Sequence, residues 1–312
     1  MRFIVLFSLL LLARLCDAQD TTVILENKAF MLPEVIVHSN MDYNSILKRI
    51  QDDTTFYKAF RTLHTIGFSA YNDIRMLDKN GNSEASYSSK TTQYRNNGCR
   101  TMKEDDVKTS GDFYDASGNY NYTTAQLYAS LFFTRGKVCG ENNIVAGINF
   151  NTEGKKGMEK HKEQLKMLFF NPGRKIPGVP FIGKKLDLYD EDAHDLYNFR
   201  LDYVPYKGSY AYVFDITPKT DLGFFKKDDI VIDRMTTWFD ANTMEVLARN
   251  YHLSYKAGVY DFDVTMEVEM AKVDDLLVPQ VLRYKGNFYA MFKGRERGEF
   301  TATLFDFKKA ND

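Results

Sequence analysis

One stretch of the chain constrains the fold more than any other. Residues 260–270, YDFDVTMEVEM, alternate apolar and polar side chains without an exception. A period of two residues is the pattern of a β-strand that buries one face and exposes the other. The register is firm, because a shift by one residue would bury the acidic side chains. The apolar face therefore lies either against the protein's own core or against a bound apolar molecule.

The first 18 residues have the pattern of a secretory signal peptide. Arg2 gives a positive start, residues 3–13 are apolar apart from Ser8, and Ala18 is a small residue at the end. The apolar run is shorter than the about 20 residues of a membrane-spanning helix. We expect export, cleavage between Ala18 and Gln19, and a soluble mature chain, with an N-terminal anchor as the alternative.

The net charge limits the class of binding partner, and the cysteine and histidine positions limit disulfides and metal sites. The formal net charge is −1, so no broad basic field is available for nucleic acid. Cys99 and Cys139 are the only cysteines left after the signal, which predicts one disulfide in an exported chain. A reactive thiol pair is the alternative, although the C-x-x-C spacing is missing. The scattered histidines give no metal site, and no cofactor is expected.

The remaining chain alternates between helical and strand periods. We expect one kinked helix or two short ones first, then hairpins, a second helix, an irregular loop and a long run of strands. In chain order these are a helix at 40–65, a hairpin over 66–77 and its return through the Asn-Gly turn 78–82, a second hairpin at 111–133, a helix at 154–170, a loop at 174–185, strands from 197 to 256, and the separate strands VPQVLRYK, NFYAMFK and FTATLFDF after residue 270. Short strands joined by tight turns indicate an antiparallel meander.

Motifs for catalysis are scarce. SILK at 45–48 matches a Ser-x-x-Lys spacing, and YDEDAHD at 189–195 concentrates acids, but neither has the partner residues that such sites require. No Gly-x-Ser-x-Gly, phosphate loop or dinucleotide fingerprint occurs in the sequence. We expect no enzyme; an exported hydrolase of an unrecognised kind is the third of three hypotheses.

Aromatic side chains make up 14% of the chain, and 12 Met residues accompany them. Aromatic residues favour strands in any β-rich core. The same residues also suit a wide cavity for lipid chains, because methionine adapts its shape to a ligand. Both interpretations stay open at this point.

The order of elements resembles the periplasmic outer-membrane lipoprotein-carrier (lipoprotein-sorting, LolA/LolB-like) superfamily. Residues 46–70 resemble that family's opening helix and first strand, and residues 231–255 resemble its hairpin with an Asp-x-x-Thr-type turn. The likeness extends over roughly 42–308. It implies an α+β fold, in which a curved antiparallel sheet forms an incomplete barrel covered by two or three amphipathic helices. Residues 19–41 would be an extended segment, and 42–312 a single domain.

The resemblance implies a non-enzymatic protein of the Gram-negative periplasm. Its partner would be a lipid or the acyl chains of a lipoprotein, with an envelope membrane protein as a further partner, and it would act as a monomer. The rival hypothesis is an interaction or structural module whose concavity is filled by its own side chains. Candidate ligand-binding residues on the apolar face are Trp238, Tyr260, Phe262, Val264, Met266 and Val268.

Overall fold

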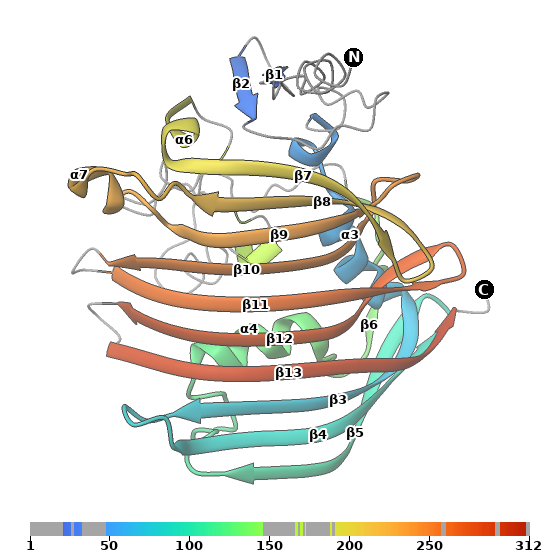
Figure 1. Ribbon diagram of the computed structural model, residues 1–312. Coiled ribbons are helices and arrows are strands. Elements are labelled where there is room, and N and C mark those ends of the chain that lie inside the picture. The colour runs from blue at the N-terminus through green and yellow to red at the C-terminus, as the bar shows by residue number, and fades with distance from the viewer. Residues whose placement is uncertain are drawn as a thin grey trace, which may run out of the picture.

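The structure is a computed structural model, and its centre is one antiparallel sheet of eleven strands (Figure 1). It describes residues 21–25, 28–32, 48–145, 166–167, 169–170, 172, 188, 191–256, 260–290 and 294–309. In sheet order the strands are β6 (Val138–Cys139), β5 (Cys99–Ser110), β4 (Ser83–Asn96), β3 (Ile66–Leu77), β13 (Gly294–Lys309), β12 (Leu276–Ala290), β11 (Tyr260–Val273), β10 (Val246–Lys256), β9 (Ile232–Asp240), β8 (Ser209–Pro218) and β7 (Tyr197–Tyr206).

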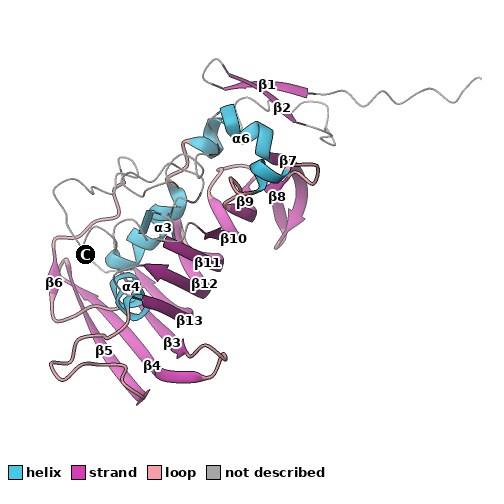
Figure 2. Ribbon diagram, turned by 90° about the vertical axis from the view of Figure 1, so that its left-hand side faces the viewer, coloured by secondary structure: helices cyan, strands magenta, loops and turns pink. Residues whose placement is uncertain are grey.

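Helices cover one face of this sheet, and the sheet itself stays open. The end strands β6 and β7 do not pair with each other. Helices α3 (Thr55–Thr62) and α4 (Thr123–Phe132) lie on the same side of the strands (Figure 2). The arrangement confirms the predicted α+β fold, an incomplete barrel covered by helices. The remaining short elements are the hairpin β1 (Thr21–Leu25) and β2 (Lys28–Leu32), the 3-10 turn η1 (Leu63–Thr65), α6 (Glu191–Leu196) and α7 (Phe224–Lys227).

The sheet consists of two meanders that lie side by side. On one side of their junction follow β3, β4 and β5, and on the other side follow β13, β12 and the strands back to β7. The two halves meet where β3 pairs with β13, with Ile74 opposite Phe300. Inward side chains of both halves therefore form one continuous apolar face.

Both free edges of the sheet carry features that disturb regular pairing. Beyond its short contact with β6, β5 is an edge strand among the described residues. It contains a register shift opposite Ser88 and Lys90, and Asp106 adopts a left-handed conformation there, with φ 55°. At the other edge, β7 contains Pro205, which has no N–H to donate to a further strand. A bulge and a proline are typical of protected edges.

Several expected boundaries are confirmed, and two expectations are wrong. The break at 52–54 separates a helical turn at 48–51 from α3, and the 78–82 turn joins β3 to β4. The hairpin expected at 111–133 is wrong after its first turn, because residues 123–132 form helix α4. Their buried positions follow helical spacing, and the Glu296 carboxylate accepts from the first backbone N–H groups of α4 at Thr123 and Thr124.

Strand β12 is longer than the sequence pattern predicts. VPQVLRYK and NFYA, expected as separate strands, form one strand that passes through Gly286 without a turn. A Cβ at Gly286 would meet the Tyr284 hydroxyl at 2.0 Å, so the glycine provides room for that ring. The ring in turn stacks on Phe300 with 4.5 Å between centroids. This glycine serves packing, not a turn.

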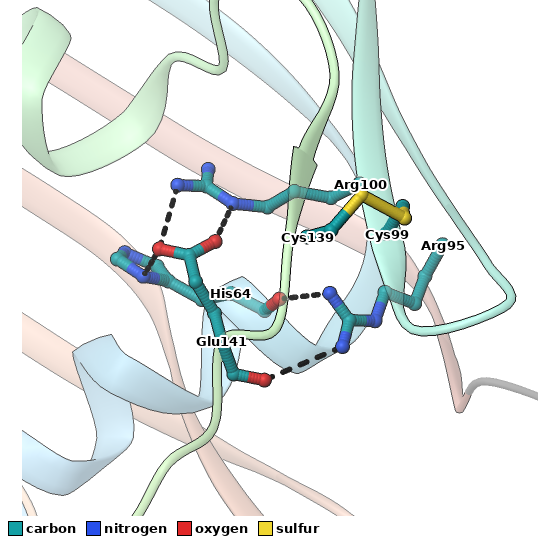
Figure 3. Close-up of a disulfide and its surroundings, with 6 residues drawn as sticks. All are labelled: His64, Arg95, Cys99, Arg100, Cys139 and Glu141. Atoms are coloured by element: carbon teal, nitrogen blue, oxygen red, sulfur yellow. Dashed lines mark hydrogen bonds and ion pairs between the residues drawn. A yellow bond between two sulfur atoms is a disulfide. The ribbon is translucent and has the colours of Figure 1, made fainter.

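A disulfide fixes a strap across the end of α3, confirming the predicted pairing. Cys99 and Cys139 lie opposite each other in β5 and β6 and are bonded (Figure 3). The strap, defined here as residues 139–143, continues to the end of the helix. There Arg61 donates to the Asn142 carbonyl at 2.8 Å, and Asn143 donates to Thr62 Oγ1 at 3.3 Å.

The middle of the strap holds a cluster of charged side chains (Figure 3). Arg100 contacts the Glu141 carboxylate at 2.5 Å, and His64 Nδ1 lies 2.8 Å from the same carboxylate. Arg95 donates to the His64 and Glu141 carbonyls. Burial and the Arg100 charge lower the pKa of His64 from 6.5 to about 4, against the opposing effect of Glu141. His64 is therefore neutral in the folded protein at neutral pH.

The signal peptide, Ala18 and Gln19 lie outside the described residues, as do the 174–185 loop and most of the helix expected at 154–170. Of that helix, residues 166–167 and 169–170 are described and are helical. Among the described residues, no helix is both long and apolar enough to cross a bilayer.

We expect reduction of Cys99–Cys139 to lower the free energy of unfolding by up to about 4 kcal/mol, because the bond restricts the unfolded chain. Urea unfolding with and without reductant measures the change. A Cys99→Ser/Cys139→Ser double variant is the control and should not respond to reductant. Equal thiol labelling before and after reduction of the wild type would contradict the bond.

Stability should depend on pH through His64. Its folded pKa lies below 6.5, so between pH 6.5 and about 4 the unfolded chain binds a proton that the folded chain does not. The free energy of unfolding should therefore fall as the pH is lowered through this window, by on the order of 2 kcal/mol. Urea unfolding at several pH values checks the slope. His64→Gln should flatten it, and an unchanged slope in that variant would rule out His64 as its source.

Candidate functional site

The apolar face of β11 is buried as its alternation predicts. Phe262 and Val264 are 5% exposed, and Met266 and Val268 are fully buried. The acidic side chains between them, such as Glu267, lie on the opposite face, which is open to solvent. The Tyr251 hydroxyl on the neighbouring strand donates to Met266 Sδ at 3.2 Å. Burial raises the pKa of Tyr251 well above its ordinary value, so this hydroxyl keeps its proton.

Aromatic side chains from the helical layer fill the space above this face. Phe56 and Phe60 point inward from α3 and contact each other at 5.4 Å between ring centroids. Phe60 also packs edge-on against Phe169 and Phe170, at 5.4 and 5.1 Å. Such tilted and edge-to-face contacts are the favourable geometry for aromatic rings. In the described part of the chain, the protein's own rings cover the apolar face.

The other two predicted ligand-binding residues stand apart from these four. Trp238 pairs with Ala248, which pairs with Glu269, so Trp238 shares the outer face with Glu269. Its ring lies 6.4 Å from that of Tyr206. The backbone of Tyr260 begins β11, and its side chain lies outside what the structure describes. The inner face thus unites Phe262, Val264, Met266 and Val268 without Trp238.

A buried arginine interrupts the inner face. Arg249 pairs with Thr237 and with Val268, which places its side chain under α3. The guanidinium donates to Thr237 Oγ1 and to the Phe170 carbonyl, each at 3.2 Å. Its central carbon lies 4.4 Å from the centre of the Phe56 ring, a cation–π contact. A buried cation needs such a complete set of partners to be tolerated.

The fourth partner of Arg249 is Asp53, two residues before helix α3. Asp53 Oδ2 lies 3.6 Å from the guanidinium, and both side chains are buried. Asp53 Oδ1 accepts from the Thr55 backbone N–H at 2.8 Å, at the start of α3. The Thr55 hydroxyl in turn accepts from the Val246 backbone N–H at 2.9 Å. One ion pair and one hydrogen bond therefore dock the start of α3 onto the sheet.

Sequence reasoning missed Asp53 and Arg249. A signal for Arg249 was available, because it lies in phase with Tyr251 and Leu253 on the apolar side of its strand. An arginine at an inward position indicates a buried partner. For Asp53 the sequence only permits a helix cap within DDTT. Nothing local shows that this cap faces an arginine from a distant strand.

The arrangement is suited to holding apolar groups. Around Met266 the described side chains are hydrocarbon, aromatic rings, thioether and the phenols of Tyr251 and Tyr284, its neighbours on the two adjacent strands. Within the described ranges, no group of three or more His, Cys, Asp or Glu side chains is placed to hold a metal ion.

No family model matches the sequence, and no curated protein matches it. Solved structures do match. A DUF1329 family protein from Desulfovibrio piger is 12% identical, with 86% of this chain and 91% of that chain covered, at a TM-score of 0.24. A domain from Vibrio parahaemolyticus, provisionally described as an outer membrane lipoprotein-sorting protein, is 9% identical, with 85% and 90% covered, at a TM-score of 0.26.

The Asp53–Arg249 pair should be strongly coupled. Arg249→Met leaves the Asp53 carboxylate buried without its cation, which should cost about 3–5 kcal/mol of folding free energy. Adding Asp53→Asn keeps an acceptor for the Thr55 backbone N–H and removes the charge, so the double variant should recover part of that loss. Urea unfolding of the four proteins gives the coupling energy.

The matched control is Arg234→Met. Arg234 is 65% exposed and pairs with Asp215 at 3.3 Å on the other face of the sheet, where the Thr236 hydroxyl also donates to Asp215. Its loss should change the free energy of unfolding by less than about 1 kcal/mol. Additive effects of Arg249→Met and Asp53→Asn would contradict the role given to the pair.

Proposed function

We propose that this protein is a non-enzymatic periplasmic protein of a Gram-negative cell envelope that binds a lipid, a lipoprotein acyl chain or another amphiphile. The bound chain would lie between the curved sheet and its helical cover. One observation carries the proposal: apart from Arg249, the inner face of β10 to β12 beneath helix α3 consists mainly of aromatic, aliphatic and methionine side chains. The signal-like pattern of residues 1–18 supports export.

Binding requires that α3 move, because Phe56 and Phe60 fill the space above Met266. Exposing two such rings costs about 1.5–3 kcal/mol for each ring. An acyl chain with about twelve buried methylenes contributes about 0.8 kcal/mol for each, or roughly 10 kcal/mol in all. The gain is about as large as the cost of exposing the rings together with the roughly 3–5 kcal/mol for separating Asp53 from Arg249. The contacts of Asp53 and Thr55 would then return α3 to the sheet after release.

A second candidate function rests on the complete burial of Met266 and Val268. A self-filled core of this kind is what an envelope interaction or structural module would have. In that case the inner face stabilises the fold and binds nothing. We propose, for either function, that residues 42–312 act as a single domain and a monomer, preceded by the extended segment 19–41. Transfer of a lipid would involve an envelope membrane protein as partner.

The two functions differ in the response to Met266→Trp. If the face binds acyl chains, the wild type should bind a fluorescent fatty-acid probe saturably. Met266→Trp should then weaken this binding about tenfold per folded molecule, because the indole occupies the chain's space. The same change should lower the free energy of unfolding by about 1–3 kcal/mol through overpacking. Probe titration and urea unfolding measure the two effects separately.

The control is Glu267→Trp, whose side chain points to the outer face, where Glu267 forms an exposed pair with Arg283 at 3.4 Å. This variant should keep both probe binding and stability. Native mass spectrometry of the purified protein should show a co-purifying mass of lipid size. Absence of saturable probe binding by the wild type would leave the self-filled module as the function.

A further inference from the structure

The outer face of the sheet carries a pocket far from the acyl-chain site proposed above. It has a volume of about 340 Å³, and its lining includes Tyr71, Ser88, Lys90 and Thr303. Tyr71 pairs with Lys90 on β4 and with Thr303 on β13. These positions alternate with the buried Ala70, which faces the helices. The pocket therefore opens on the face opposite to α3 and α4.

Tyr71 forms an aromatic wall of this pocket. Its side chain is 56% exposed and lies on the outer face, between β4 and β13. Phe305 stacks against it with 5.0 Å between centroids and an interplanar angle of 26°. Phe305 lies two residues after Thr303 on β13, so it is on the same face, but it does not line the pocket. Phe305 therefore supports the Tyr71 ring, which itself belongs to the pocket lining.

The charged groups around the pocket balance each other. Lys90 and Lys108 contribute two ammonium groups, and Asp73 and Asp106 contribute two carboxylates. Neither lysine has an ion-pair partner within the part of the chain that the structure describes. Lys90 Nζ instead lies 5.8 Å from the centroid of Tyr71. Asp73 pairs with Arg75 at 2.8 Å.

The neighbouring groove on the same face differs in this respect. Its charged side chains pair with one another, as Arg283 does with Glu267 at 3.4 Å and Lys285 with Glu299 at 3.0 Å. Paired charges leave few donors and acceptors for a ligand. The pocket beside Tyr71 keeps two ammonium groups available and adds the hydroxyls of Ser88, Thr301 and Thr303.

We propose that this pocket binds a saccharide. The apolar C–H face of a sugar ring would stack on Tyr71, because the face of an aromatic ring is electron-rich. Sugar hydroxyls both donate and accept hydrogen bonds, so they suit carboxylates, ammonium groups and hydroxyls at once. Because the lining carries charges of both signs, it suits a neutral sugar better than a phosphate or a nucleic acid. The sugar is either a free oligosaccharide or the headgroup of a glycolipid.

The test uses two soluble neutral probes, maltotetraose and tetra-N-acetylchitotetraose, and vesicles that contain a digalactosyl lipid. We expect at least one probe to bind the full chain, with amide chemical shifts in NMR changing at Ser88 and Thr301. Tyr71→Ala should weaken that binding about tenfold or more. Binding of the vesicles alone would assign the saccharide to a glycolipid headgroup.

Tyr94→Ala is the matched control. Tyr94 is 55% exposed, lies on the same face in β4, and does not line the pocket. This variant should bind the probes as the wild type does. Lys108→Gln should weaken binding, while Lys103→Gln, which removes a lysine already paired with Asp105 at 2.7 Å, should not. No binding of any probe at millimolar concentration, or equal binding by Tyr71→Ala, would overturn the proposal.

Discussion

The pairing of β3 with β13 is the interaction on which the rest of the structure depends. It joins β3, the first strand of the sheet in chain order, to β13, the last one, and so links the two meanders into one surface. Helix α3 leads through η1 directly into β3, yet it packs against β12 on the other side of this junction. The position of α3, the strands beneath it and the strap at its end therefore all depend on the pairing of β3 with β13.

The two faces of the sheet have separate chemistry because strand alternation keeps them apart. The inner face contains the rings of Phe56 and Phe60 and the buried Arg249, all enclosed by the helical layer. The outer face carries hydroxyls, ion pairs and the Tyr71–Phe305 stack. The sheet backbone separates the side chains of the two faces, so a ligand bound on one face does not require a change on the other face.

The sequence predicts those parts of the fold in which local pattern and tertiary position agree. Strand β11 alternates cleanly, so its buried and exposed sets follow from the sequence alone. Trp238 could not be placed in this way, because Met235, Thr236 and Thr237 are buried in succession and hide the period of β9. Helix α4 was missed because its cap, Glu296, comes from a distant strand. The contact between Arg249 and Asp53 depends likewise on tertiary docking, which no local pattern encodes.

The irregular edges of the sheet affect whether copies of the protein can associate edge to edge. A regular strand edge offers unpaired backbone groups to any extended chain, and copies of a sheet protein can add to each other in this way. Here the left-handed Asp106 bends β5 out of register, and Pro205 removes a donor from β7. Neither edge presents a straight template for a twelfth strand. Many copies can therefore share a crowded compartment without growing into ribbons.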